Sequence, residues 1–255
     1  MRRLEQRLKR SRAVPGGTEY ALEFGLAGSD RIPALLTLPA GSARAPAALL
    51  LHGYSSRKEM MSEHVGRGLL AHGVAGLAID LPLHGDRKNP VQTQAMGDPL
   101  QLVRRWREAL AECALGLGYL GARAEIDRER LAIVGYSLGS YLAVASAAKE
   151  RTVKAVVLAA GGDLPSGTPV SMLARSVADP LKAVRQIAGR PLLMVHGRRD
   201  RTVTPDQARR LYEAAGNPKE LRWYDAGHIL PAGVIDGVGA WLADRLKPAD
   251  RSGTG

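Results

Sequence analysis

One serine of the chain stands in a setting that suits a nucleophile. It is Ser137, in the G-x-S-x-G sequence Gly135-Tyr136-Ser137-Leu138-Gly139. An apolar strand-like run precedes this motif and an alanine-rich helical pattern follows it. At such a turn the serine is held in a strained backbone conformation, and the flanking glycines let strand and helix approach closely. The pattern predicts a nucleophile elbow at Ser137; the alternative is a glycine-rich turn with an incidental serine.

A serine hydroxyl needs a base to accept its proton, and His228 is the histidine whose position fits this role. It follows the strand-like run Glu220–Tyr224 and comes after the serine, in a loop. Two histidines before the serine, His52 and His84, lie in loops that could approach the site. The remaining three are expected to be packing or surface residues: His64, His72 and His196.

The base in turn needs an acid that orients its ring, and Asp200 is the first candidate. It follows the strand-like run Leu192–His196, and the loops after parallel strands meet at one edge of a sheet. Asp163, after the preceding strand, and Asp225 are the alternatives. Asp163 is the more credible of these two.

Acyl transfer also needs donors for the developing oxyanion, each worth about 3 kcal/mol. The backbone N–H of Leu138, directly after the serine, is one candidate. The backbone N–H of Tyr54, in the turn after the apolar run Ala47–Leu51, is the other. The alternative for this His52-Gly53 turn is an ordinary connection between strand and helix.

The acyl pocket has candidates near these groups. They are Met60, Met61 and Tyr136, joined by Tyr54 and the segment Leu164–Ile187. Ordinary packing is the alternative for each of them.

Strand-like and helix-like segments alternate from Thr18 onward. The expected strands are Thr18–Phe24, Ile32–Leu38, Ala47–Leu51, Val74–Ile79, Leu131–Val134, Ala155–Ala159, Leu192–His196 and Glu220–Tyr224. The expected helices are about Lys58–His72, Leu100–Gly121, Leu138–Lys149, Pro205–Ala215 and Val234–Leu246. Such alternation predicts an α/β fold: a mostly parallel central sheet of about eight strands with helices on both faces. The first two strands have no helix between them, which predicts an antiparallel N-terminal edge.

One α/β domain is expected over residues 18–247, with a basic N-terminal tail over 1–17 and a flexible C-terminal tail over 248–255. The segment Leu81–Pro99 is rich in Pro, Gly and Asn and is expected to be a long loop. Residues 161–190 are more than one crossover helix requires. They predict a small lid-like insertion, helical over Val170–Ile187 and interrupted at Asp179-Pro180.

The composition is that of a folded globular protein. Of 255 residues, 45% are hydrophobic and 24% charged, which excludes overall disorder and a fibrous repeat. The apolar runs are far shorter than the roughly 20 residues that span a bilayer, so no membrane span is expected. A single cysteine, Cys113, cannot form an internal disulfide, and the N-terminus lacks a secretory signal pattern. We therefore expect a cytoplasmic protein, and the absence of a metal-ligand cluster predicts no metal and no cofactor.

The net charge of +11 raises the question of a nucleic-acid partner. Residues 1–12 hold six basic side chains against one acidic, and the remaining excess is spread along the chain. Aromatic residues are only 4%, which leaves few platforms for base stacking. We expect no nucleic-acid binding, and the sequence leaves the oligomeric state open.

Five motifs stand in the order typical of the α/β-hydrolase superfamily, which the chain resembles over roughly Thr18 to Leu246. They are Leu51-His52-Gly53-Tyr54, Asp80-Leu81-Pro82-Leu83-His84-Gly85, Gly135-Tyr136-Ser137-Leu138-Gly139, His196-Gly197-Arg198-Arg199-Asp200 and Ala226-Gly227-His228. The compact core is similar to the dienelactone-hydrolase-like and prolyl-oligopeptidase-like esterases. Ser137 stands where true dienelactone hydrolases have cysteine, and the His-Gly-Gly-Gly motif of the hormone-sensitive-lipase branch is missing. No propeller domain precedes the core, which argues against an oligopeptidase.

The resemblance implies a serine hydrolase that cleaves small-molecule carboxylic esters of small to medium acyl groups through an acyl-enzyme. A thioesterase, an amidase or an acyltransferase would use the same triad and is the first alternative. A noncatalytic binding protein of this fold, with a basic surface for an anionic partner, is the distant one. The natural substrate depends on the shape of the pocket, which the sequence does not give.

Overall fold

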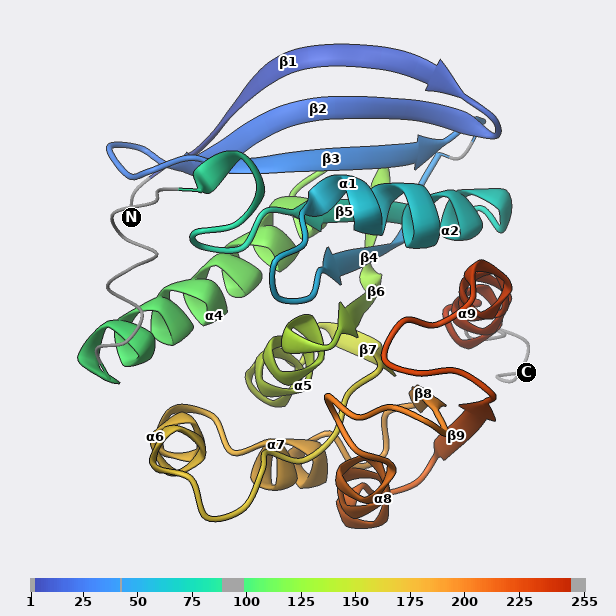
Figure 1. The fold of residues 1–255 in the computed structure, drawn as a ribbon. Helices are drawn as coiled ribbons and strands as arrows, with labels where there is room; N and C mark the ends of the chain where they lie inside the picture. The colour runs from blue at the N-terminus through green and yellow to red at the C-terminus, as the bar shows by residue number, and fades with distance from the viewer. Residues whose placement is uncertain (1–2, 42, 89–98, 249–255) are drawn as a thin grey trace, which may run out of the picture.

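A nine-stranded sheet forms the centre of the computed structural model, which describes residues 3–41, 43–88 and 99–248 (Figure 1). The strand order is β1-β2-β3-β5-β4-β6-β7-β8-β9. The strands are β1 Leu4–Val14, β2 Gly17–Leu26, β3 Ile32–Pro39, β4 Ala45–Leu51, β5 Ala75–Ile79, β6 Ile126–Tyr136, β7 Val153–Ala159, β8 Leu192–Gly197 and β9 Lys219–Tyr224. Strands β4 to β9 pair in parallel, and β1, β2 and β3 form an antiparallel edge. This confirms the predicted fold class.

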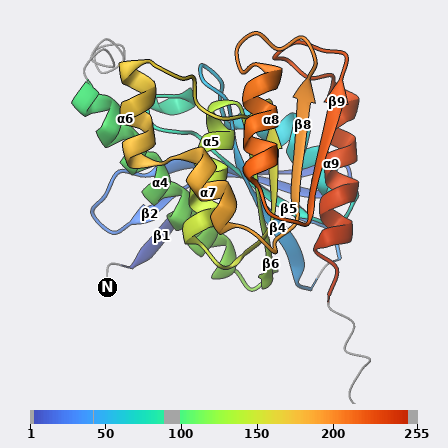
Figure 2. The same ribbon diagram turned by 90° about the horizontal axis from the view of Figure 1, so that it is seen from below.

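Helices cover both faces of the sheet (Figures 1 and 2). They are α1 Lys58–Met61, α2 Arg67–Ala71, α4 Pro99–Gly121, α5 Leu138–Lys149, α6 Pro169–Val177, α7 Pro180–Gln186, α8 Pro205–Ala214 and α9 Ala232–Arg245. The π-helix η1 Ser62–Gly66 joins α1 to α2, so the single helix expected over residues 58–72 is divided. The short 3-10 helix η2 Gly85–Arg87 lies in the expected long loop, whose residues 89–98 are outside the described part, as are 249–255 of the expected C-terminal tail.

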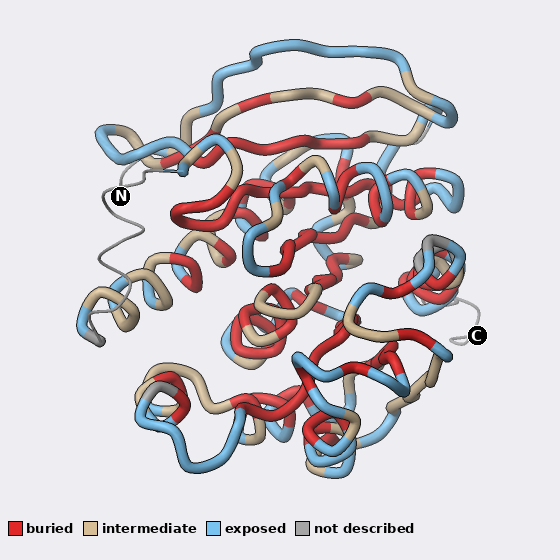
Figure 3. The backbone as a smooth tube through the Cα atoms, in the orientation of Figure 1, coloured by how far each residue is buried: buried red, intermediate tan, exposed pale blue. Residues whose placement is uncertain are grey.

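Two separate apolar cores lie on the two faces of the sheet. Successive strand residues point to opposite faces of a sheet. In β4, Ala48 and Leu50 therefore belong to the core covered by α2 and α9. Leu49 and Leu51 belong to the core on the other face, which is covered by α4, α5, α7 and α8. Strands that are buried on both faces need continuous apolar sequences, which is why runs such as Ala47–Leu51 predict them well. Figure 3 shows this burial concentrated in the middle of the sheet.

The N-terminal segment differs from the prediction. Residues 4–14, expected to lie in a basic tail, form strand β1 along the outer side of β2, so the sheet has nine strands rather than about eight. Most of β1 is exposed (Figure 3), and so it lacks the apolar signature of a buried strand. It is held by its backbone ladder and by ion pairs across it, Arg12 to Glu19 at 2.7 Å and Lys9 to Glu23 at 3.1 Å.

Residues 161–190 form the two short helices α6 and α7 on the side of α4 and α5 (Figure 2). The Thr168 hydroxyl caps α6, and the Asp179 carboxylate caps α7 by accepting from the backbone N–H of Leu181 at 2.9 Å. A proline follows each cap at the first helical position, where its missing N–H is not needed. The interruption expected at Asp179-Pro180 is therefore the start of α7.

Candidate active site

Ser137 lies at the sharp turn between β6 and α5, with φ of 50° and ψ of −111°. A positive φ is uncommon for a residue with a side chain and indicates local strain. The Ser137 N–H donates to the Ala159 carbonyl oxygen at 2.9 Å, which ties the turn to β7. Glycine is required on both sides, because a Cβ at Gly135 would clash with the Gly139 carbonyl and a Cβ at Gly139 with the Leu51 carbonyl. Ser137 thus lies at the N-terminus of α5, on the turn between strand and helix where the sequence predicted an elbow.

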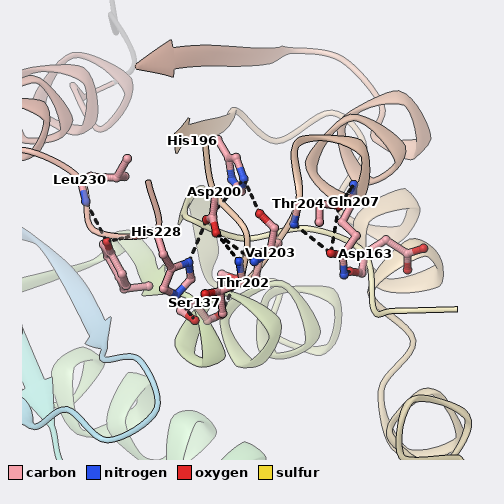
Figure 4. A network of polar contacts seen from close by, with 12 residues as sticks. Ser137, Asp163, His196, Asp200, Thr202, Val203, Thr204, Gln207, His228 and Leu230 are labelled. Atoms are coloured by element: carbon pink, nitrogen blue, oxygen red, sulfur yellow. Dashed lines mark hydrogen bonds and ion pairs between the residues drawn. The ribbon is translucent and has the colours of Figure 1, made fainter. Parts of the chain in front are cut away.

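The structure brings three of the predicted residues into one hydrogen-bonded line. The His228 ring lies between Ser137 and Asp200 (Figure 4). Its Nε2 is 2.9 Å from Ser137 Oγ, and its Nδ1 is 2.8 Å from Asp200 Oδ2. Because an ionised carboxylate only accepts, the proton of the neutral ring sits on Nδ1, and Nε2 is left to accept from the serine hydroxyl. These residues come from loops after β6, β8 and β9 at one edge of the sheet.

Asp200 is buried and held by its own loop. Its Oδ1 accepts from the backbone N–H groups of Thr202, at 2.8 Å, and Val203, at 3.0 Å. Its Oδ2 is then available to the His228 ring. Two backbone donors stabilise the negative charge and fix the plane of the carboxylate.

The two alternative acids lie elsewhere. Asp163 is buried, but its carboxylate is paired with Arg175 at 2.6 Å and with Arg210 at 3.1 Å. Figure 4 shows it beside Gln207 and away from His228. Asp225 is exposed and pairs with Arg199 at 3.1 Å. Asp200 is therefore the carboxylate that contacts His228.

His196 packs behind the Asp200 loop. It is buried, and burial lowers the pKa of its ring, so the neutral ring donates from Nε2 to the Val203 carbonyl oxygen at 2.9 Å. Its Nε2 also lies 3.6 Å from Asp200 Oδ2. His196 thereby holds the same loop whose N–H groups bind Asp200.

Tyr136 makes contacts that the sequence did not predict. Its hydroxyl donates to the backbone carbonyl of His228 at 2.6 Å and accepts from the N–H of Leu230 at 3.1 Å. Burial raises the pKa of Tyr136, so the hydroxyl stays protonated and able to donate. The residue before Ser137 therefore fixes the loop that carries His228.

The loop after β4 brings a second group of backbone amides to Ser137. A Cβ built at Gly53 would lie 3.4 Å from Ser137 Cβ, so the Gly53 backbone packs directly against the serine. Within the described part of the chain, the N–H groups of Tyr54 and Leu138 have no hydrogen-bond acceptor. Leu138 directly follows Ser137, and Tyr54 lines the same cavity as Ser137.

His52 fixes the peptide that carries one of these donors. Its Nε2 accepts from the Leu81 N–H at 3.1 Å, so Nδ1 carries the proton and donates to the Gly53 carbonyl at 2.7 Å. This carbonyl and the Tyr54 N–H belong to the same peptide unit, whose plane is rigid. Burial lowers the pKa of His52 to about 4, which keeps the ring neutral.

A cavity of about 500 Å³ opens beside Ser137. Its lining residues are Gly53, Tyr54, Ser56, Met60, Met61, His64, Val65, Tyr136, Ser137, Thr202, His228, Ile229 and Leu230. The predicted pocket residues Met60, Met61 and Tyr136 are among them. His64, expected to be a packing or surface residue, also lines the cavity.

The insertion over residues 161–190 does not line this cavity with any residue that the structure describes. Instead, α6 packs against α4, and α7 packs between α5 and α8. The expectation that Leu164–Ile187 contributes to the pocket is therefore wrong. Arg175 of α6, itself only half-buried, pairs with the buried Asp163 and so holds α6 against the body of the domain.

Over residues 3–41, 43–88 and 99–248, no cluster of three or more His, Cys, Asp or Glu side chains could hold a metal ion. In the same part of the chain, no helix has the length and apolar character needed to cross a membrane.

Comparisons with known proteins show the family and the fold of the chain. A family model described as "Alpha/beta hydrolase family" matches residues 48–245, well over half of the chain. A curated relative, "Hydrolase LUC6" from Fusarium sp., is 30% identical over 146 residues. That match covers 55% of this chain, but the chain spans only about a third (33%) of the relative's length.

Solved structures share the fold. An esterase from an Arctic intertidal metagenomic library superimposes with a TM-score of 0.73 at 22% identity, over 93% of this chain and 98% of the esterase. Acetyl xylan esterase 1 from Thermoanaerobacterium sp. gives 0.76 at 20% identity, over 97% and 89%. An acetyl xylan esterase from Paenibacillus sp. R4 gives 0.76 at 20% identity, over 96% and 89%.

Proposed function

Since the chain belongs to the alpha/beta hydrolase family, we propose that it is a serine hydrolase that cleaves carboxylic esters through an acyl-enzyme intermediate. The observation that carries the proposal is the His228 ring between Ser137 Oγ, at 2.9 Å, and Asp200 Oδ2, at 2.8 Å. Ser137 and His228 line a 500 Å³ cavity that is largely apolar, where an ester can reach the serine.

In the first half of the reaction, Ser137 Oγ attacks the ester carbonyl carbon while His228 Nε2 takes the hydroxyl proton. Asp200 keeps the ring in the Nδ1–H tautomer and stabilises the positive charge that develops on it. The carbonyl oxygen becomes negative and accepts hydrogen bonds from the N–H groups of Tyr54 and Leu138. The bond to the alcohol then breaks, and His228 gives its proton to the departing alcohol oxygen.

In the second half, water attacks the carbonyl carbon of the acyl-enzyme. His228 Nε2 takes one water proton, the same two N–H groups hold the oxyanion, and the acyl group leaves as the carboxylic acid. Ser137 Oγ recovers its proton from His228, so the catalytic groups return to their starting state. The neutral His52 supports both steps, because it holds the peptide of the Tyr54 N–H in a fixed plane.

A rapid-mixing assay with p-nitrophenyl butyrate tests the proposal. We expect a burst of one equivalent of p-nitrophenol per active site, followed by slower turnover, and a butyryl adduct on Ser137 by mass spectrometry. Ser137→Ala, with unchanged circular dichroism, should abolish both. A burst that persists in Ser137→Ala, or no hydrolysis of any ester by the folded protein, would refute the proposal.

A further inference from the structure

A second, smaller cavity of about 170 Å³ lies next to the first. Its lining residues are Tyr54, Leu81, Pro82, Leu83, His84, Leu102, Arg105, Trp106, Ala109, Leu138 and Leu142. Tyr54 lines both cavities. Of the two residues that carry candidate oxyanion donors, Leu138 lines the smaller cavity and Tyr54 stands between the two, whereas Ser137 and His228 line the larger one.

The smaller cavity suits an uncharged group. Its lining is largely apolar, and Arg105, its one charged residue in the described part, is paired with Glu108 at 2.7 Å. The His84 ring is engaged through Nδ1 with the Pro82 carbonyl oxygen at 2.8 Å. Leu83 contributes to the wall from a backbone with φ of 65°, an unfavourable conformation for leucine that this tight loop imposes.

The direction of the ester follows from where the proton and the negative charge must go. This step rests on the proposed function. The leaving oxygen must lie within hydrogen-bond reach of His228 Nε2, which protonates it. The oxyanion must face the amides of Tyr54 and Leu138. The alcohol part therefore starts on the His228 side, in the larger cavity, and the acyl part extends past the oxyanion donors toward the smaller one.

We propose that the 170 Å³ cavity binds the acyl group and the 500 Å³ cavity binds the alcohol, so that the substrates are short-chain esters of bulky apolar alcohols. An apolar cavity of about 150 Å³ is known to hold benzene, so the acyl group has about six carbons or fewer. The larger cavity lies within the roughly 300–1,000 Å³ of sites for drug-sized ligands.

Exposed apolar side chains beside the larger cavity fit this division. Tyr54 is 60%, Met60 43% and Ile229 84% exposed, and all three line that cavity. Exposed apolar residues grouped at one site indicate a partner or ligand that covers them. A bulky alcohol that fills the cavity and extends to its mouth would do so.

Two ester series on the full chain test the assignment. The first keeps p-nitrophenol and lengthens the acyl group from acetyl to butyryl, hexanoyl, octanoyl and decanoyl. The second keeps acetyl and enlarges the alcohol from ethyl to butyl, cyclohexylmethyl and 1-naphthylmethyl, all primary alcohols of similar leaving ability, with acid release followed by pH-stat. We expect kcat/KM to fall at least tenfold beyond hexanoyl and to rise at least tenfold from ethyl to 1-naphthylmethyl acetate.

Matched variants assign each preference to its cavity. Leu142→Ala and the less buried Leu102→Ala enlarge the smaller cavity and should move the acyl optimum to longer chains, without changing the order of the acetates. Met60→Trp narrows the larger cavity and should lower kcat/KM for 1-naphthylmethyl acetate more than for ethyl acetate, with the acyl profile unchanged. Two variants for the smaller cavity keep the test usable if one fails to fold.

The outcomes separate the two proposals. If the burst depends on Ser137 but decanoyl esters are the best of the acyl series, or Met60→Trp moves the acyl optimum, the assignment is wrong and ester hydrolysis stands. If the folded protein hydrolyses no ester of either series, the proposed function itself is wrong.

Discussion

At the scale of single residues, Tyr136 shows how the residue beside the proposed nucleophile, Ser137, can position the proposed base, His228. Its hydroxyl bonds the backbone of His228 and of Leu230, more than 90 positions along the chain. The imidazole must stay within about 3 Å of the serine oxygen to take its proton. A loop that is fixed at its own backbone holds that distance better than one fixed only through the ring.

We therefore predict that Tyr136→Phe lowers kcat by about 10- to 100-fold, since a small misplacement of a catalytic group can cost about that much. KM should change little, because the aromatic ring that lines the cavity is retained. Steady-state kinetics with p-nitrophenyl butyrate give both parameters. Tyr141→Phe is the matched control, because its hydroxyl contacts the Asp163 carbonyl, away from His228, at 3.4 Å. Equal kcat values for the two variants would rule out a positioning role.

At the scale of elements, an ion-pair cluster centred on the buried Lys58 and Asp80 joins the loops that surround the site. Lys58 at the start of α1 binds the Asp80 carboxylate after β5 at 2.8 Å and the Asp86 carboxylate in η2 at 2.7 Å. Burial by itself would lower the pKa of Lys58, but these hydrogen bonds and the one to Glu59 raise it above its ordinary value. Asp80 is fully buried and also accepts from the N–H groups of Lys58 and Asp86.

Lys58→Met should reduce the free energy of unfolding by about 3–5 kcal/mol, because it leaves a buried carboxylate without its cation. Urea denaturation followed by circular dichroism measures this change. Arg57→Met, which removes the neighbouring exposed cation paired with Glu59 at 3.7 Å, should cost less than about 1 kcal/mol. Lys58→Met combined with Asp80→Asn should recover part of the loss; a loss as small as that of Arg57→Met would contradict a structural role.

The elements also show what the sequence could and could not predict. The inner parallel strands were predictable because burial on both faces leaves continuous apolar runs, and the end of β8 located Asp200. The edge strand β9 is only half-buried and has no such run, so His228 was found by its place in a loop after the serine and the acid. Strand β1 was not, since an exposed edge strand is specified by backbone pairing and by charges such as Arg12 opposite Glu19. The role of Tyr136 in fixing the His228 loop was equally hidden, because it depends on how close two distant loops come in the folded chain.

At the scale of the whole molecule, two buried neutral histidines near the site make the free energy of unfolding depend on pH. His52 and His196 are fully buried, and burial lowers the pKa of both, that of His52 from 6.5 to about 4. In the unfolded chain these rings bind protons near their ordinary pKa of about 6.5. The unfolded state therefore binds more protons than the native state between pH 6.5 and 4, and acid in this range favours unfolding.

We predict that the contribution of these two neutral rings to the free energy of unfolding is complete above about pH 7. The free energy of unfolding then falls as the pH drops from 6.5 toward 4. The shift of His52 corresponds to about 3 kcal/mol over this range. Urea titrations at pH 7.5, 6, 5 and 4.5 measure the slope. His52→Gln, which can donate and accept but does not titrate, should flatten it, whereas His72→Gln, a substitution at an exposed position, should not. A slope that His52→Gln leaves unchanged would mean that His52 takes up its proton in the native state, and the Tyr54 peptide would then lose its fixed support in acid.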